Sequence, residues 1–303
     1  MKYILYLFAI FILCNIIIIK RASFEENNLK LSIYNIFNKK IKTKMRLFFF
    51  SDLHEKNYIS NNKIIFDYIN KESPSLILIG GDMIITNKRI ENANDNKIET
   101  TCLLLKKINE DYPNTKVIYA LGNHEERLDF FYSKSDIIKN QYDTLYSEIN
   151  KNNTLLLKNS YIDINNEIRV YAITLGKGAF RNGLNDSNRD KILSKELLNE
   201  KIGKLDKNKY NILLLHSPDY IKQVEYLGFE LILCGHLHGG MVRIPFIGAA
   251  LGPNFQILPK YSRGHYKHLN SDLIVSAGMG THTIKIRLNN LPEICEVNLN
   301  GNN

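Results

Sequence analysis

Eight side chains that can bind metals or transfer protons each follow a short apolar run of the sequence. They are Asp52, His54, Asp82, Asn123, His124, His216, His236 and His238. An isolated Asp after a strand is usually a turn residue, and an isolated His is usually structural. However, the chain has eight His in all, and five of them stand in these positions. We therefore treat the eight side chains as one candidate site.

The donor types indicate which metals such a site would bind. Imidazole and carboxylate groups, with no Cys among them, suit Mn, Fe, Zn or Co rather than a structural zinc knot or an iron–sulfur cluster. Eight donors also exceed what one ion needs. Two divalent ions bridged by one carboxylate are the economical arrangement, and pairs about 3.5–4 Å apart catalyse phosphoryl hydrolysis.

The elements that must position these side chains are short strands. The preceding apolar runs show no alternation, which is typical of strands buried on both faces; they are 47–51, 76–80, 116–120, 212–215 and 231–234. Helices are expected at 60–71, 97–110, 136–150, 191–203 and 219–227, and more β structure at 154–175 and 273–298. This pattern predicts a layered α/β domain. In such sheets ligands bind at the carboxyl ends of the strands, where all eight side chains stand.

Five motifs in a fixed order carry a family resemblance. They are Asp52-Leu53-His54, Gly81-Asp82, Gly122-Asn123-His124-Glu125, His216 and Gly235-His236-Leu237-His238. On these motifs, residues 46–298 resemble the calcineurin-like metallophosphoesterase superfamily. The tail from Gly235 onward is similar to the membrane-anchored bacterial branch with a GHTHGGQ-type motif. Met241 stands where that branch usually has Gln, so any role of that side chain is in doubt.

The resemblance implies a four-layer αββα sandwich and a set of site roles. Asp52, His54 and His238 would hold one metal, Asn123, His216 and His236 would hold the other, and Asp82 would bridge them. His124 would not be a ligand but a catalytic residue beside the bound phosphate. Ser/Thr protein phosphatases and purple acid phosphatases carry Asp or Tyr where this chain has Ile85, so neither activity is expected.

The first 21 residues are expected to be a transmembrane anchor. From Tyr3 to Ile19 the sequence has no charge, and its seventeen residues approach the length needed to span a bilayer. A cleaved secretory signal and an apolar core helix are the alternatives. A cleaved signal peptide typically has a shorter apolar run followed by a cleavage site of small residues, such as A-x-A. Residues 22–45 are expected to be a basic juxtamembrane linker, 46–298 the phosphoesterase domain and 299–303 a tail.

The net charge of +9 is concentrated near the start of the chain. Residues 1–46 contain nine Lys and Arg and two acidic residues, so the rest is close to neutral. The apolar content of 44% excludes wholesale disorder, and four Cys at unrelated spacings imply no disulfide framework. Basic residues after the apolar run favour a cytoplasmic catalytic domain, although Lys2 precedes it.

These features predict a metal-dependent phosphoric ester hydrolase that cleaves phosphodiester or pyrophosphate bonds. Lipid-linked or nucleotide-sugar diphosphates are one substrate class, favoured by the anchor and by the apolar segment 244–251. The basic residues Arg243, Lys260, Arg263, His265 and His268 are candidates for a second phosphate contact or for a solvated loop. A nuclease or cyclic-nucleotide phosphodiesterase is the alternative, but a nearly neutral domain makes nucleic acid a poor partner. A non-catalytic scaffold would be expected to have lost ligands, which this chain has not.

Overall fold

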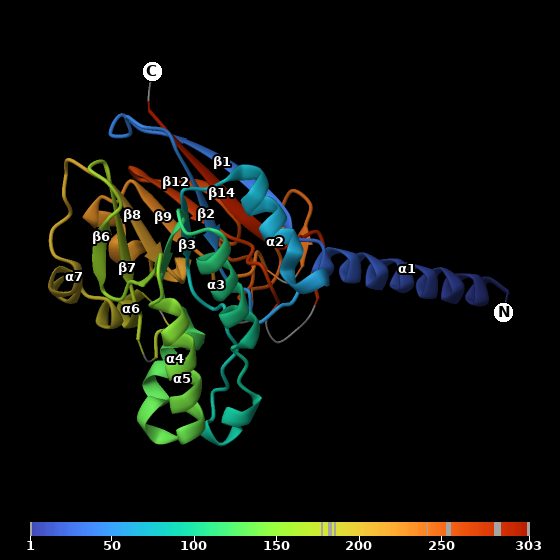
Figure 1. Ribbon diagram of the computed structural model, residues 1–303. Coiled ribbons are helices and arrows are strands. Elements are labelled where there is room, and N and C mark those ends of the chain that lie inside the picture. Colours follow the sequence, from blue (N-terminus) through green and yellow to red (C-terminus); the bar gives the residue numbers. More distant parts are fainter. Residues whose placement is uncertain are drawn as a thin grey trace.

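Two six-stranded sheets pack face to face, with helices on both outer surfaces (Figure 1). The computed structural model describes residues 2–176, 178–180, 184, 186–240, 242–252, 256–281 and 286–301. The predicted four-layer αββα sandwich is therefore confirmed.

The first sheet has the strand order β1-β14-β2-β3-β4-β5. Its strands are β1 (Lys30–Phe37), β2 (Met45–Phe50), β3 (Leu76–Ile79), β4 (Lys116–Tyr119), β5 (Thr154–Leu156) and β14 (Glu293–Asn300). Strands β2 to β5 run parallel, whereas β14 is antiparallel to β2 and parallel to β1. Parallel neighbours end at the same edge, which is why the residues that follow β2, β3 and β4 meet.

The second sheet has the order β12-β13-β9-β8-β7-β6. Its strands are β6 (Ser160–Asp163), β7 (Ile168–Ile173), β8 (Tyr210–Leu215), β9 (Leu231–Cys234), β12 (Gly264–His268) and β13 (Ser271–Val275). The four central strands are parallel and the two edge strands are antiparallel. A small separate hairpin is formed by β10 (Arg243–Ile244) and β11 (Gly248–Ala249).

Eight α-helices are present in the described residues, and all except α1 lie against the domain (Figure 1). They are α1 (Lys2–Asn27), α2 (Ile59–Glu72), α3 (Glu99–Asp111), α4 (Asn123–Phe131), α5 (Asp136–Ile149), α6 (Asp186–Ile192), α7 (Lys195–Ile202) and α8 (Ile221–Val224), with 3-10 turns at Ile90–Asp95, Tyr132–Lys134, Pro218–Tyr220 and Glu225–Leu227. Apolar residues of α2, α3 and α5 pack on the first sheet, and those of α7 and α8 pack on the second. Helix α4 was not expected; it is short and begins on the predicted site residues themselves.

The alternation of side chains along each strand explains why the apolar runs are continuous. Phe48 and Phe50 of β2 face the helices, whereas Leu47 and Phe49 face the second sheet. In β8, Leu214 faces the first sheet and Leu213 faces the helices. Both faces of each central strand are buried, so no polar residue interrupts these runs.

The start of the chain differs from the expected linker. Residues 30–37 form β1, which pairs along its whole length with β14, and Ile36 is buried between the sheets. The sequence of β1 shows little hydrophobic periodicity because an edge strand buries few of its side chains. Its pairing partner, β14, lies near the other end of the chain, so no local pattern indicated the pairing. Helix α1 projects away from the sandwich, and its residues from Tyr3 to Arg21 are exposed (Figure 1).

Candidate metal centre

The carboxyl ends of five strands bring the predicted side chains together. Among the described residues, three overlapping groups have ligand atoms that all lie within 4.8 Å of one another: Asp52, His54 and His238; His54, Asp82 and His124; and Asp82, His216 and His236. All of these side chains are buried. Asn123 begins α4, and its buried Oδ1 has no hydrogen-bond partner within the described ranges. An oxygen in that condition is suited to binding a ligand.

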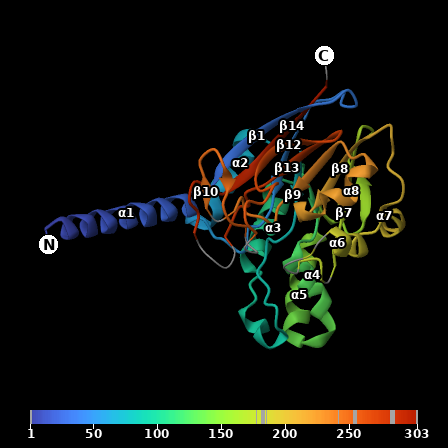
Figure 2. The same ribbon diagram turned by 180° about the vertical axis from the view of Figure 1, so that it is seen from behind.

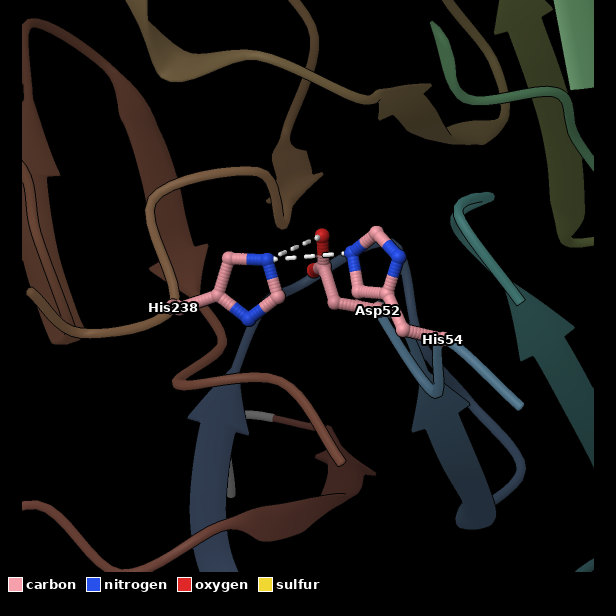
Figure 3. Close-up of side chains that lie close together, drawn as sticks. All are labelled: Asp52, His54 and His238. Atoms are coloured by element: carbon pink, nitrogen blue, oxygen red, sulfur yellow. Dashed lines mark hydrogen bonds and ion pairs between the residues drawn. The ribbon is translucent and has the colours of Figure 1, made fainter. Parts of the chain in front are cut away.

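The side chains of the first group, Asp52, His54 and His238, lie close together (Figure 3). Nε2 of His238 lies 3.1 Å from Nε2 of His54 and 3.5 Å from Oδ1 of Asp52. Nδ1 of His238 lies 3.2 Å from the carbonyl oxygen of Gly280. Because a carbonyl can only accept, Nδ1 carries the proton and a neutral His238 presents a lone pair from Nε2. A lone pair facing a carboxylate oxygen suits a metal ion between them.

A second candidate metal position is formed by the group of Asp82, His216 and His236, which has the same arrangement around His216. Its Nδ1 lies 2.8 Å from the carbonyl oxygen of Gly80, and its Nε2 lies 3.2 Å from Oδ2 of Asp82. The same Oδ2 lies 3.8 Å from Nε2 of His54 in the first group. Asp82 therefore stands between the two groups, which is the position that a bridging carboxylate needs. The residues fit a pair of divalent cations.

His124 is held in the opposite tautomer. The backbone N–H of Thr86 donates to Nδ1 of His124 at 2.7 Å, and Nη1 of Arg127 lies 3.5 Å from the same nitrogen. With Nδ1 accepting, a neutral His124 carries its proton on Nε2 and is a donor there. This difference separates His124 from His216 and His238, although its distances would also allow it to be a ligand.

The backbone at the site is strained. Five of the predicted ligands have positive φ angles, at Asp52 (55°), His54 (44°), Asp82 (52°), His236 (69°) and His238 (51°). Residues other than Gly seldom adopt this left-handed backbone region, because each such residue costs about 1–3 kcal/mol in conformational energy. The surrounding structure holds these residues in unfavourable conformations, as is common at functional sites.

Two glycines let the carboxylates approach the backbone closely. A Cβ on Gly235 would lie 2.2 Å from Oδ2 of Asp52, and one on Gly122 would lie 2.3 Å from Oδ1 of Asp82. Both contacts are too short for any side chain. Close packing against the two carboxylates therefore requires glycine at both positions.

The buried carboxylate of Asp82 stabilises positive charge on the groups around it. Burial would raise the pKa of Asp82, but the neighbouring imidazoles of His216, His124 and His54 lower it well below its usual range. Burial would lower the pKa of His216, but the Asp82 carboxylate outweighs this effect and raises it to about 10. The pair stabilises a proton where a metal cation would otherwise bind.

Glu125 organises the centre, although the sequence analysis assigned it no role. Its carboxylate accepts from the backbone N–H groups of Asp82 (2.8 Å), Met83 (2.9 Å) and Gly122 (3.0 Å), and from Oη of Tyr119 (2.9 Å). It therefore joins the loops after β3 and β4. In the sequence, Glu125 could have been identified by its position directly after His124 in the Gly122-Asn123-His124-Glu125 motif.

A cavity of about 750 Å³ adjoins the centre at Asn123. Its lining includes the basic residues Lys88, Arg127 and Lys158, together with Phe130 and Phe180. The ring of Phe180 also packs on His236, at 5.0 Å between centroids. The lining also includes the acidic residues Glu126 and Asp129, so the cavity joins the candidate metal centre to a wall that carries both signs of charge and aromatic rings.

The other predicted basic residues are mostly engaged elsewhere. Nη1 of Arg243 donates to the carbonyl oxygen of Gly239, and Arg263 pairs with Glu293 at 3.0 Å. His265 pairs with Asp272 (2.6 Å) and His268 with Glu225 (2.5 Å). These bonds give the residues structural roles, while Lys260 packs over the ring of Tyr261. Met241 lies outside the described residues.

Comparisons with known proteins agree with this geometry. The family model described as calcineurin-like phosphoesterase matches residues 45–240. The uncharacterized protein YpbG of Bacillus subtilis is 25% identical over 92% of this chain and 90% of its own. The uncharacterized metallophosphoesterase YkuE of the same organism is 24% identical over 84% of this chain and 78% of its own. The phosphodiesterase YaeI of Escherichia coli is 30% identical over 29% of this chain and 32% of its own.

Proposed function

The chain belongs to the calcineurin-like phosphoesterase family, and on that premise we propose that it is a membrane-anchored phosphoesterase that uses two divalent metal ions. It would hydrolyse phosphodiester or pyrophosphate bonds. The observation that carries this proposal is the position of Asp82 between two groups of metal-binding side chains.

Each group would hold one ion. Asp52, His54 and His238 would bind the first, Asn123, His216 and His236 would bind the second, and Asp82 would bind both. Such ions lower the pKa of a water molecule and offset negative charge on phosphoryl oxygens. Mn, Fe, Zn and Co are all compatible with these ligands. The carbonyl groups of Gly80 and Gly280 contribute by keeping Nδ1 protonated on His216 and His238.

His124 would act as the proton donor. The Thr86 N–H bond leaves the proton of neutral His124 on Nε2, where it can be given to the leaving oxygen. The backbone N–H of His124 also donates to Oδ1 of Asp82 at 2.8 Å. The same residue thus orients the bridging carboxylate and supplies an acid.

The adjoining cavity supports a substrate with a second anionic or planar group. Lys88 could contact a further phosphate, and the Phe side chains could contact an apolar or aromatic group. Lys158 pairs with Asp129, and Nη1 of Arg127 donates to Thr86, so these two would have to give up those bonds to contact phosphate. A phosphodiester or a diphosphate has such a second group, whereas a simple phosphomonoester need not. The name of YaeI is consistent with a phosphodiester substrate.

Helix α1 supports a membrane location. By length and composition it can cross a bilayer, although a signal sequence passes the same test. A core helix would be buried, whereas the apolar part of α1 is exposed within the structure. The last turn packs on the domain, since Glu25 is buried there. This location, with a cytoplasmic domain as the charge distribution favours, would suit lipid-linked or nucleotide-sugar diphosphates.

Hydrolysis of bis(p-nitrophenyl) phosphate by the purified full chain tests the proposal. We expect activity that requires added Mn²⁺ or another divalent metal and is abolished by chelation. Inactivity with every divalent metal would favour a scaffold. A panel of lipid diphosphates, nucleotide sugars, cyclic nucleotides and linear DNA at equal concentration then identifies the substrate class, and a large preference for DNA would favour the nuclease alternative.

A further inference from the structure

The hairpin β10–β11 exposes apolar side chains at its tip. Phe246 is fully exposed, and its neighbour Ile247 is 64% exposed. A nearby loop exposes Ile257 (80%) and Leu258 (55%), and the backbone N–H of Leu258 donates to the carbonyl of Ala250, just beyond the hairpin. A group of apolar side chains that the fold leaves in contact with solvent generally marks an interaction surface.

This apolar tip belongs to the part of the domain that holds the end of α1. Oε2 of Glu25 accepts a hydrogen bond from the backbone N–H of Asn290 at 2.7 Å. The preceding residue, Asn289, donates through Nδ2 to the carbonyl oxygen of Arg243 in β10 at 3.1 Å. Figure 2 shows β10 beside the inner end of α1. The hairpin and the helix end are therefore neighbours.

The length of α1 fixes how far this region lies from a bilayer. The uncharged run ends at Ile19, and Glu25 follows six residues later, or about 9 Å along the helix. The headgroup layer of one leaflet is about 5–8 Å thick. If the apolar run spans the hydrocarbon core, Glu25 stands at the outer limit of the headgroups, within reach of the hairpin beside it.

We propose that the apolar tip, formed by Phe246, Ile247, Ile257 and Leu258, inserts into the headgroup region of the leaflet from which α1 emerges. The inference rests on the proposed membrane anchor. A lipid surface is favoured over a second protein copy because four protruding side chains are far fewer than the roughly 20–30 residues per side of a stable protein interface. Phe and Leu are also the residues with which peripheral elements enter the interface.

The insertion would orient the metal centre. Nη1 of Arg243 in the hairpin donates to the carbonyl oxygen of Gly239 at 2.8 Å, directly after the predicted ligand His238. Nδ2 of Asn290, beside the helix end, donates to the carbonyl oxygen of His238 at 2.7 Å. The hairpin and the segment beside the end of α1 are thus both hydrogen-bonded to the loop that carries His238. They would keep this loop near the depth at which lipid phosphates lie. The favoured substrate class is therefore one whose phosphate lies in the headgroup layer.

The absence of Trp from the chain allows a direct test. Phe246→Trp and Ile247→Trp each introduce a single Trp, which can be excited selectively over Tyr, into the full chain reconstituted in phosphatidylcholine vesicles. Lipids brominated near the glycerol end or near the methyl end of the acyl chain then report the depth of the indole. Phe11→Trp in the apolar run is the control for the anchor. Tyr161→Trp on β6, far from α1 in Figure 1, is the control for an exposed site.

We expect blue-shifted emission from the hairpin variants and stronger quenching by the shallow bromines than by the deep ones. The Phe11→Trp variant should be quenched by the deep bromines, and the Tyr161→Trp variant by neither. Solvent-like, unquenched emission from both hairpin variants while Phe11→Trp is quenched would overturn the insertion but not the anchor. A blue shift without quenching would indicate a protein partner and would also overturn it. If Phe11→Trp is not quenched, the anchor itself fails.

Discussion

The backbone N–H of Thr86 donates to Nδ1 of His124 at 2.7 Å, whereas the corresponding nitrogen of His216 lies against a carbonyl oxygen. Two imidazoles at one centre are therefore held in opposite tautomers. In its neutral form His216 presents a lone pair from Nε2 toward Asp82, where a metal ion would replace the proton, whereas neutral His124 presents an N–H group from Nε2. This contrast is the physical basis for treating one as a metal ligand and the other as an acid.

Replacement of His124 by Ala should lower turnover by about 10²-fold or more while metal content stays near that of the wild type. Turnover with an alkyl leaving group should fall more than turnover with p-nitrophenolate, because the better leaving group needs less protonation. Steady-state kinetics and elemental analysis measure both effects. His265→Ala, which removes an imidazole paired with Asp272, is the matched control. Loss of metal with loss of activity would instead make His124 a ligand.

Replacement of Asp82 should affect both metal ions, because its Oδ2 lies near side chains of both groups. We expect Asp82→Ala to lose both ions, whereas His216→Ala and His238→Ala each lose mainly one. Elemental analysis gives the stoichiometry, and the Mn²⁺ electron paramagnetic resonance spectrum reports whether two ions remain coupled. Retention of two coupled ions in Asp82→Ala would contradict the bridging role.

Glu125→Gln should destabilise the protein although Glu125 contacts no substrate in the proposed mechanism. The carboxylate accepts three backbone N–H groups and the Tyr119 hydroxyl, and an amide cannot accept them all. A loss of about 3 kcal/mol in the free energy of unfolding is expected from charge-assisted bonds of this kind. That loss would lower the melting temperature by roughly 6–12 °C for a domain of this size. Glu110→Gln, on the exposed face of α3, should change it little.

The raised pKa of Glu126 predicts that the stability of the protein depends on pH. Burial raises its pKa from 4.5 to about 7, despite hydrogen bonds from the backbone N–H groups of Leu175 and Gly176. The folded state therefore binds more protons than the unfolded state between these values. The free energy of unfolding should fall as the pH rises from about 4.5 to about 7, by at most about 3 kcal/mol.

Glu126→Gln should remove this dependence, because the amide does not ionise. Melting temperatures of the detergent-solubilised protein at pH ~5 and pH ~8 measure it, and the difference between wild type and variant isolates the contribution of Glu126. The Glu110→Gln control should keep the dependence. An identical pH response in wild type and Glu126→Gln would show that Glu126 stays ionised throughout.

The sequence alone was enough to predict the fold class and the donors of the centre. Each central strand is buried on both faces, so its apolar run marks its extent, and the residue after the run marks the edge where ligands bind. Asp52 and His216 could be placed in this way because both signals are local. The family match and the four-layer architecture confirm the predicted family and fold class. The site residues and their individual roles stay predictions.

Only the tertiary structure decided which hydrogen bonds orient these donors. The carbonyl of Gly80 that fixes the tautomer of His216 is 136 residues away in the chain, and no local pattern encodes their contact. The same is true of β1, which was expected to be a linker and instead pairs with β14, and of the bond between Glu25 and Asn290, which are 265 residues apart. Such contacts exist only after the sheets have packed, because the packing brings distant backbone groups within hydrogen-bonding distance.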